Sequence, residues 1–315
     1  MKRIHAVMLG CLSIMALGLG VAQAATKTAS VGKIIVSGAS GQLGGLTVKE
    51  LLARGVKPQD LILVSRTPDT LAEYRKMGAT VRMGDPAKPE TLAAAYKGGK
   101  SMVMISIGFG GKDAPPRPVS HKAAFDAAVK DGVTHIVYTS FLLADVTQSP
   151  IAADHIKSEA SLRASGADWT ILRNGLYADG LIRQAQQMVA TGKAEVNPNE
   201  AKMANVTRED CAAAAAGAIL DRRARNRIYE ITGPDLLGTR ELAALVTEVT
   251  GRNIVVSQMS PEEVAKSRSM MGGPEMALVT NAVQDLAGRP ATTMKAFLEE
   301  HKAQLLMPPA PMPPR

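Results

Sequence analysis

The sequence predicts an α/β fold, in which a doubly wound parallel sheet is followed by a small, mostly helical C-terminal lobe. Two observations predict it. From residue 33 onward, short apolar runs alternate with helical patterns, the order that produces parallel β-α-β units. Some runs, such as residues 101–107, are nearly continuously apolar, as expected for strands buried on both faces of a sheet.

The elements follow in order along the chain. Strands are expected at residues 34–36, 61–64, 80–83, 101–107, 135–139 and 169–172, and helices after Gly44 and at residues 70–77, 89–96, 120–131 and 153–164. Beyond Asn174 the order loosens, with helices at 181–191, 209–220, 239–250, 261–266, 275–285 and 293–306 and strands at 227–231 and 254–258. We therefore expect a first domain at residues 33–174 and a C-terminal lobe at 175–307, which can share sheet strands.

The chain ends are expected to lie outside these domains. Residues 1–24 have the pattern of a signal peptide, with basic Lys2-Arg3, an apolar stretch and an Ala-x-Ala site ending at Ala24. This pattern predicts export, to the periplasm, with residues 25–32 as a flexible leader; an uncleaved membrane anchor or a cytoplasmic protein is the alternative. Residues 308–315 are proline-rich and are expected to be disordered.

Composition and charge exclude several classes of protein. The 315 residues are 46% hydrophobic and 21% charged, which suits a globular protein, and no stretch of the mature chain is long enough to span a membrane. The net charge of +8 is spread out, so no nucleic-acid partner is expected. Cys211 is the only cysteine beyond the leader and predicts no internal disulfide. The sequence leaves the oligomeric state open.

No metal site is expected. The histidines are scattered along the chain, and no H-E-x-x-H or C-x-x-C motif occurs. These histidines are His5, His121, His135, His155 and His301.

A glycine-rich turn follows the first strand. Gly38 permits a tight turn, Gly41 lets the backbone approach a pyrophosphate, and Gly44 lets the following helix pack close to the strand. The helix N-terminus would supply amide groups to the phosphates. The pattern favours a Rossmann-type NAD(P)-binding domain over a purely structural turn. The expected cofactor-binding residues are Gly38, Ala39, Ser40, Gly41, Gln42, Leu43 and Gly44.

The end of the second strand carries the cofactor preference. Folds that prefer NAD usually place an acidic residue there, whereas this strand ends in Val64-Ser65-Arg66-Thr67. Arg66 can pair with a 2′-phosphate, which predicts NADP(H) over NAD(H); the alternative is a surface arginine in a turn. After the third strand, Asp85 either accepts a hydrogen bond from the adenine amine or caps the next helix.

Several longer motifs carry a family resemblance over residues 33–300. They are Gly38-Ala-Ser-Gly-Gln-Leu-Gly44, Tyr138-Thr139-Ser140-Phe-Leu-Leu-Ala144-Asp145, Ala153-Asp154-His155, Leu172-Arg173-Asn174-Gly175-Leu-Tyr177, Thr207-Arg208-Glu-Asp210 and Gly288-Arg289-Pro290-Ala-Thr-Thr293. The chain resembles the NmrA-like, atypical branch of the short-chain dehydrogenases, and most of all its type-2 bacterial NAD(P)H:quinone oxidoreductases. The resemblance implies NADPH bound across the strand ends and a quinone or similar small-molecule acceptor, reduced by direct hydride transfer, between the lobes.

One departure concerns catalysis. Most short-chain dehydrogenases use a serine and a Tyr-x-x-x-Lys pair, but this chain has His155-Ile-Lys-Ser-Glu159 in place of that pair. Ser140 supplies the serine. His155 and Glu159 are either a helix-stabilising i,i+4 pair, or His155 donates a proton to the reduced quinone. Quinone reduction needs little acid catalysis, because hydroquinone oxygens are far less basic than an alkoxide.

The acceptor side is predicted from the strand ends, where ligands bind in such sheets. Phe109, Phe141, Arg173, Asn174 and Tyr177 are the expected substrate residues, and hydrogen bonding within the loops is the alternative for the last three. A non-catalytic NAD(P)-binding sensor or scaffold of the NmrA-like type is the second functional hypothesis. A sugar-nucleotide epimerase is disfavoured because the tyrosine is missing.

Overall fold

Seven parallel strands form the main sheet, in the order β3-β2-β1-β4-β5-β6-β8, within the residues that the computed structural model describes, 32–108, 114–147, 149–266 and 273–309. Their bounds are β1 Ile34–Ser37, β2 Leu61–Ser65, β3 Thr80–Met83, β4 Ser101–Met104, β5 His135–Phe141, β6 Asp168–Asn174 and β8 Arg227–Ile231. The predicted signal peptide, most of the leader, Phe109 and residues 310–315 lie outside the described residues.

The strand order reverses beside β1. Successive strands move from β1 outward to β2 and β3, and the chain then returns to place β4 on the other side of β1. Such a reversal opens a crevice at the carboxyl ends of the two central strands, where open α/β sheets bind ligands. The fold predicted from the sequence, a doubly wound parallel sheet with a largely helical C-terminal part, is therefore confirmed.

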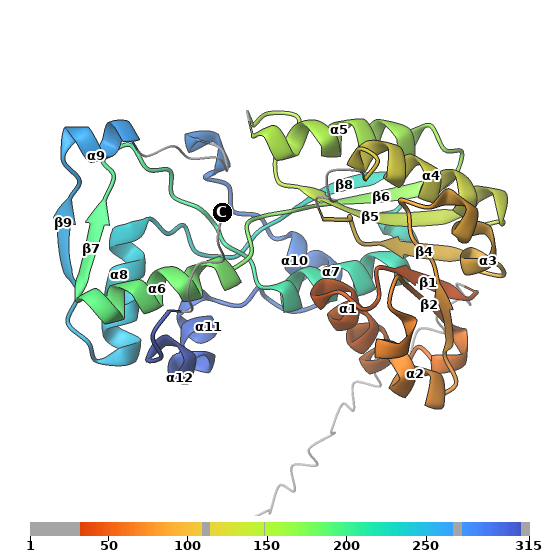
Figure 1. The fold of residues 1–315 in the computed structure, drawn as a ribbon, viewed down its shortest axis with the longest axis horizontal. Helices are drawn as coiled ribbons and strands as arrows, with labels where there is room; N and C mark the ends of the chain where they lie inside the picture. Colours follow the sequence, from red (N-terminus) through yellow and green to blue (C-terminus); the bar gives the residue numbers. More distant parts are fainter. Residues whose placement is uncertain (1–31, 109–113, 148, 267–272, 310–315) are drawn as a thin grey trace, which may run out of the picture. The chain divides into compact units, whose positions relative to one another are not determined.

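Helices cover both faces of the sheet (Figure 1). The helices are α1 Gln42–Ala53, α2 Ala72–Lys76, α3 Leu92–Tyr96, α4 Arg117–Lys130, α5 Pro150–Arg163, α6 Asp179–Thr191, α7 Arg208–Leu220, α8 Thr239–Thr250, α9 Pro261–Lys266, α10 Ala282–Ala287, α11 Met294–Glu300 and α12 Lys302–Leu305. In this view α4 and α5 lie above the strands, and α1, α7 and α10 lie below, while α3 packs against α4. Side chains of one strand alternate between the two layers: Val137 of β5 packs toward α1 and α7, and Ile136 and Tyr138 pack with α3 and α4.

Helix α7 consists mostly of small residues because it lies between α1 and α10. A Cβ atom at Gly217 would lie 1.8 Å from the carbonyl oxygen of Leu286, so only glycine permits this approach to α10. Asp210, in the first turn of α7, accepts hydrogen bonds from Arg289 (2.5 Å) and from the amide of Thr292 (2.8 Å). This contact joins the Thr207–Asp210 motif at the start of α7 to the Gly288–Thr293 motif directly after α10.

The C-terminal lobe has its own small core. Side chains from α6, α8 and α11, including Ile182, Leu242 and Phe297, form a separate apolar cluster. Beside it, β7 (Lys193–Val196) pairs in parallel with β9 (Val255–Gln258). The sequence predicts a strand near β9 but not β7, which has only four residues, of which Ala194 alone is buried.

The strand after α3 is shorter than predicted, ending at Met104 instead of residue 107. The next amides leave the β4–β5 ladder: Ser106 N–H donates to Thr139 Oγ1 (2.8 Å) and Ile107 N–H donates to His121 Nε2 (3.1 Å). Beyond Met104 the backbone therefore follows side chains of β5 and α4 instead of the ladder. In the part of the chain that the structure describes, no helix has both the length and the apolar character to cross a membrane.

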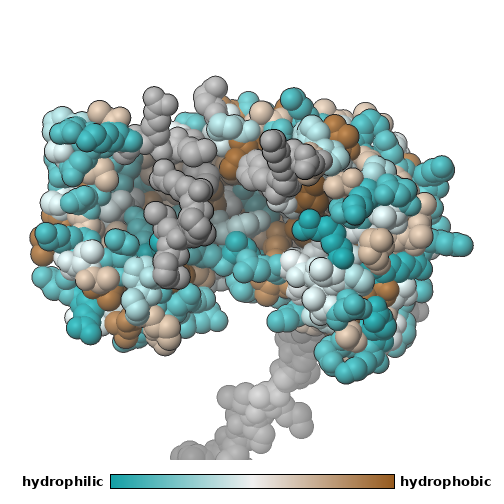
Figure 2. Space-filling model, in the orientation of Figure 1, coloured by the Kyte–Doolittle hydropathy of each residue, from teal (hydrophilic) through white to brown (hydrophobic). Residues whose placement is uncertain are grey.

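The surface is largely hydrophilic, with small scattered apolar areas on the face shown in Figure 2. The exposed large apolar residues, such as Met77, Val119 and Val255, come from different elements of the fold. Scattered residues of this kind are normal for a folded protein, so they indicate no docking surface.

Candidate functional site

A cavity of about 670 Å³ lies at the strand-order reversal beside β1. Its size falls within the range of small-molecule and cofactor sites. It is lined by Ser37, Gly38, Ser40, Gly41, Ser65, Arg66, Gly84, Asp85, Pro86, Ala87, Lys88, Ile105, Ser106, Ile107, Gly108, Ala114, Pro115, Arg117 and Ser120. The lining therefore comes from the segments that follow β1, β2, β3 and β4 and from the start of α4.

The glycine turn forms the middle of the cavity wall. Gly38 adopts a left-handed φ of 88°, and a Cβ atom at Gly44 would lie 2.1 Å from the carbonyl oxygen of Gly38, so both positions require glycine. Gly38, Ser40 and Gly41 line the cavity, and α1 begins at Gln42 directly after them. A helix N-terminus beside an exposed glycine turn suits a phosphate group, so the residues present fit a dinucleotide.

Three other residues of this turn that were predicted to bind the cofactor, Ala39, Gln42 and Leu43, do not face the cavity. Ala39 and Leu43 are buried in the core that α1 forms with the sheet, while Gln42 is exposed on the first turn of α1. None of these three lines the cavity among the described residues.

Arg66 is exposed and lines the cavity directly after β2. Next to it lies a group of hydroxyls: Ser40 Oγ is 2.6 Å from Ser65 Oγ, which accepts a hydrogen bond from the amide of Thr67 (2.9 Å). At the end of β2, the cavity lining thus has the Arg66 cation and the Ser65 hydroxyl, whereas Asp69, the first carboxylate after β2, is not among the lining residues. This set of groups suits a phosphate better than a ribose hydroxyl.

Asp85 and Lys88 line the neighbouring part of the cavity, after β3. Asp85 Oδ1 accepts a hydrogen bond from the amide of Ala87 (3.0 Å), which holds the turn between them. The predicted contact of Asp85 with adenine stays a prediction. Lys88, which the sequence reasoning missed, adds a second exposed cation near Arg66 at this end of the cavity.

Arg117, at the start of α4, lines another part of the cavity and is only 8% exposed. Its Nη1 donates to His155 Nε2 (3.2 Å), and His155 Nδ1 lies 2.9 Å from the hydroxyl of Tyr138. Because Arg117 is a donor only, His155 Nε2 must be the acceptor, and the ring carries its proton on Nδ1.

His121 continues this buried network. Its Nε2 accepts from the amide of Ile107 (3.1 Å), and its Nδ1 lies 2.9 Å from Ser158 Oγ and 3.1 Å from the hydroxyl of Tyr138. Burial and the charge of Arg117 lower the pKa of His155 to about 3. Burial, His155 and Arg117 lower the pKa of His121 to about 3 as well. Both rings are therefore neutral at physiological pH.

This geometry argues against His155 as a proton donor. The side chain is 5% exposed and is absent from the cavity lining, and its one accessible lone pair is occupied by Arg117. A ring with a pKa of about 3 holds no transferable second proton between pH 5 and 8. Although the histidines are far apart in the sequence, two of them, His121 and His155, are neighbours in the fold, with ring centroids 6.5 Å apart.

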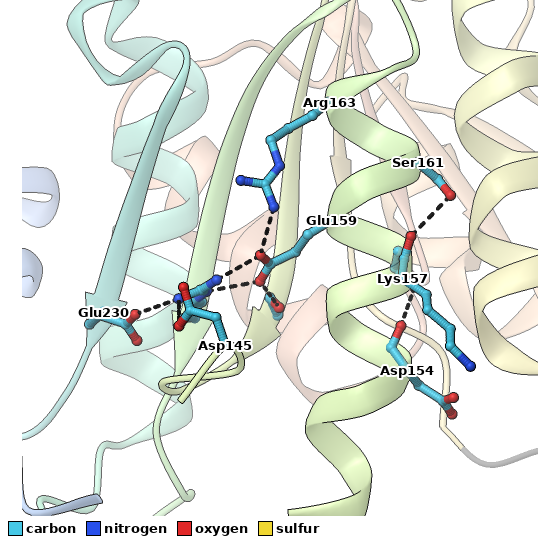
Figure 3. Close-up of polar contacts among 10 residues, drawn as sticks. Asp145, Asp154, Lys157, Glu159, Ser161, Arg163 and Glu230 are labelled. Carbon is cyan, nitrogen blue, oxygen red and sulfur yellow. Dashed lines mark hydrogen bonds and ion pairs between the residues drawn. The ribbon is translucent and has the colours of Figure 1, made fainter. Parts of the chain in front are cut away.

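Ser140 belongs to a different buried cluster. Its hydroxyl donates to Glu159 Oε1 (2.6 Å), and Arg173 donates to both oxygens of Glu159 (2.9 and 2.8 Å). Arg173 also donates to Asp145 (2.6 Å) and Glu230 (3.1 Å). Figure 3 shows Glu159 projecting from α5, with Arg163 on one side and Asp145 and Glu230 on the other.

Arg173 is thus engaged with three carboxylates and is absent from the cavity lining among the described residues. Its side chain is 4% exposed and that of Glu159 is fully buried. A buried carboxylate is stable only when it is paired, so the Arg173–Glu159 pair is needed by the fold. These contacts favour the alternative interpretation, hydrogen bonding within the protein, over a substrate contact.

The remaining substrate candidates lie near the ends of β5 and β6. The Phe141 ring stacks against His155 with a centroid distance of 6.3 Å. Asn174 Nδ2 is 3.5 Å from the hydroxyl of Tyr177, and the guanidinium of Arg208 lies 4.4 Å from the centre of the Tyr177 ring. Their contact with an acceptor stays a prediction, as does that of Phe109, which lies outside the described residues.

Sequence reasoning missed Arg117 because the predicted helix began at residue 120 and placed it in a loop. The signal that could have found it is a lone arginine at a helix start after the fourth strand, directly following Pro115 and Pro116. Among the residues that the structure describes, no group of three or more His, Cys, Asp or Glu side chains could hold a metal ion.

Comparison with known proteins places this cavity in context. A family described as NAD(P)H-binding matches residues 38–222, which include the glycine turn and most of the cavity. Quinone oxidoreductase 2 of Escherichia coli strain K12 is 31% identical over 242 residues, which cover 77% of this chain and 83% of that protein.

Solved structures of two reductases are also similar to this chain. The NADPH complex of the NADPH-dependent quinone oxidoreductase of Escherichia coli superposes with a TM-score of 0.75 at 28% identity, covering 85% of this chain and 99% of that chain. Triphenylmethane reductase of Citrobacter sp., complexed with NADP(H), has a TM-score of 0.76 at 28% identity, with the same coverage of both chains.

The neutral histidines predict a specific dependence of stability on pH. In the unfolded chain a histidine binds a proton near pH 6.5, whereas His155 in the folded state binds one only near pH 3. Its contribution to the free energy of unfolding is therefore complete above pH 6.5 and is lost as the pH falls toward 3. A His155→Gln variant should lose less stability between pH 6 and 4, by about 1.4 kcal/mol per pH unit. Urea unfolding of both proteins checks this, and parallel curves would refute a neutral His155.

The Arg173 cluster predicts a large difference between two arginines that both face Glu159. Arg173→Met leaves a buried carboxylate without its main partner and should lower the free energy of unfolding by about 3–5 kcal/mol. Arg163 is 42% exposed and lies 3.7 Å from the same carboxylate, so Arg163→Met should cost no more than about 1 kcal/mol. Denaturant unfolding measures both. Equal, small losses would return Arg173 to the list of substrate residues.

Proposed function

The chain belongs to the NAD(P)H-binding, NmrA-like family, and we propose that it uses NADPH to reduce quinone-like acceptors. The observation that carries the proposal is the cavity at the strand-order reversal, which joins a phosphate-binding glycine turn to cationic groups. Its similarity to a quinone oxidoreductase over 77% of the chain supports the acceptor class. The similarity to a reductase of triphenylmethane supports a wider range of conjugated acceptors.

Three parts of the cavity wall would hold the cofactor. The turn at Gly38–Gly41 and the start of α1 suit the pyrophosphate. Arg66, with the hydroxyls of Ser40 and Ser65, suits a 2′-phosphate. This combination, with no carboxylate among the residues at the end of β2 that line the cavity, supports a preference for NADPH over NADH.

When bound, the reduced nicotinamide supplies a hydride to the acceptor. The protein itself binds the cofactor and the acceptor and holds them next to each other. A histidine that is neutral and buried, such as His155, is not suited to protonate the product. Hydroquinone oxygens are weak bases, so solvent can supply the proton.

Cofactor binding and turnover test the proposal together. The purified protein is titrated with NADPH and with NADH, followed by nicotinamide fluorescence, and a simple benzoquinone is then added. We expect tighter binding of NADPH and its oxidation on addition of the quinone. Binding without turnover over several acceptors would favour a non-catalytic sensor or scaffold, and no binding would leave the glycine turn a purely structural feature.

The same titration applied to Arg66→Ala tests the cofactor preference. Loss of a charge-assisted contact of about 1.5–3 kcal/mol should raise the Kd for NADPH about 10- to 100-fold and leave the Kd for NADH nearly unchanged. Arg75→Ala, which removes an exposed arginine of α2, is the matched control. If the Arg66 variant binds NADPH as well as the control does, the assignment of Arg66 is wrong.

We also propose that the protein is exported, because residues 1–24 have the charge, apolar stretch and Ala-x-Ala site of a signal peptide. The expected result is a mature protein that starts at Ala25 in a periplasmic fraction. N-terminal sequencing of the protein purified from cell fractions checks this. Protein in the cytosolic fraction that retains Met1 would contradict export.

A further inference from the structure

Arg117 lies apart from the other cations of the cavity. Arg66 and Lys88 line the part that follows β2 and β3, whereas Arg117 reaches His155 of α5, next to the end of β5. In the sheet, β1 and its glycine turn lie between β2 and β4, and β5 follows β4. A phosphate held at Arg66 and a pyrophosphate held at the glycine turn therefore leave the β4–β5 side of the cavity for the reacting end of the ligands.

A buried histidine, His155, holds the guanidinium of Arg117 in place. The guanidinium donates to His155, whose ring is held by the hydroxyl of Tyr138 and stacks on Phe141. His155 is neutral, so this contact orients the guanidinium without cancelling its charge. The charge is carried on a side chain that is 8% exposed and borders the cavity, where the surroundings screen it less than bulk water does.

We propose that Arg117 stabilises the negative charge that an acceptor oxygen gains during reduction, and that His155 is a positioning residue for Arg117. The inference rests on the proposed function. A quinone that takes up a hydride, which is two electrons and one proton, becomes a hydroquinone monoanion while NADPH is oxidised to NADP⁺, and one proton from water then completes the hydroquinone. A fixed guanidinium beside the oxygen favours this anion over the neutral quinone, which is how oriented donors lower a barrier.

The substrate class follows from this chemistry. The acceptor must place a carbonyl oxygen, or another atom that becomes anionic on reduction, against Arg117. Flat conjugated acceptors such as quinones satisfy this requirement, since their reduced oxygen bears the charge in the plane of the ring. An isolated ketone gives a much more basic alkoxide, which needs a proton donor that the neutral His155 cannot be.

The test compares Arg117→Met and Arg117→Lys with Lys122→Met, which removes an exposed charge from the same helix. Three quantities are measured: the Kd for NADPH, kcat with a benzoquinone, and the Kd of the NADP⁺-loaded protein for 2-hydroxy-1,4-naphthoquinone, an anion at neutral pH. For Arg117→Met we expect kcat to fall about 100-fold or more, with the anion bound at least about 10-fold more weakly. The Kd for NADPH should stay within about 2-fold. Arg117→Lys should recover part of the loss, and Lys122→Met should match the wild type.

Other outcomes separate this inference from the proposed function. If the wild type reduces no quinone, the proposed function fails, and equal binding of the anionic naphthoquinone to wild type and Arg117→Met then overturns the inference as well. If the wild type is active but Arg117→Met turns over like Lys122→Met, only the inference is overturned. A rise in the Kd for NADPH with kcat unchanged would make Arg117 a cofactor contact instead.

The positioning role of His155 has its own readout. His155→Leu removes the acceptor for Arg117 and should lower kcat while leaving the shape of its pH profile between pH 5 and 8 unchanged. His155→Gln keeps an acceptor and should recover part of the activity. Loss of an inflection near pH 6.5 in the leucine variant would show that His155 titrates during turnover, which contradicts a neutral positioning residue.

Discussion

The ion pair between Arg173 and Glu159 is the interaction on which the carboxyl edge of the sheet depends. It joins β6 to α5 with two parallel hydrogen bonds, and the same guanidinium reaches Asp145 after β5 and Glu230 on β8. Four segments from distant parts of the sequence therefore meet at one buried charge. Arg173 and Glu159 are both buried, so removing either one leaves the charge of the other inside the protein without its main partner.

The cavity lies along this edge of the sheet, and its cationic side chains lie in two separate parts of the lining. Arg66 and Lys88 lie after β2 and β3, and Arg117 lies toward α5, with the glycine turn between them. The histidines behind Arg117 are neutral, and the carboxylate of Glu159 is already paired with Arg173. The interior thus contributes an oriented cation and few titrating groups, which suits transfer of a hydride better than repeated transfer of protons.

Much of this could be read from the sequence, for reasons that are local. The glycine turn, the α1 helix and the apolar strands are specified by neighbouring residues, so the sequence could place Gly38 after β1, Gly44 in the first turn of α1 and Arg66 after β2. Their contacts with a cofactor stay predictions. Contacts across the fold could not be read in the same way. Arg173 follows the pattern of a strand-end ligand, yet the sequence does not say that three carboxylates surround it. Arg117 and His155 are 38 residues apart, and only the packing of α4 on α5 joins them.

The small residues of α7 have a consequence for how the protein can be studied. Cys211 is fully buried among its alanines, and burial, with the nearby Asp210, raises the pKa of its thiol. A thiol in this state does not react with maleimides or disulfide reagents while α7 is packed. Because Cys211 is the only cysteine after residue 11, the rate of its alkylation reports how often the α1–α7 layer opens. The chain therefore contains its own probe of local unfolding, at the layer that supports the glycine turn.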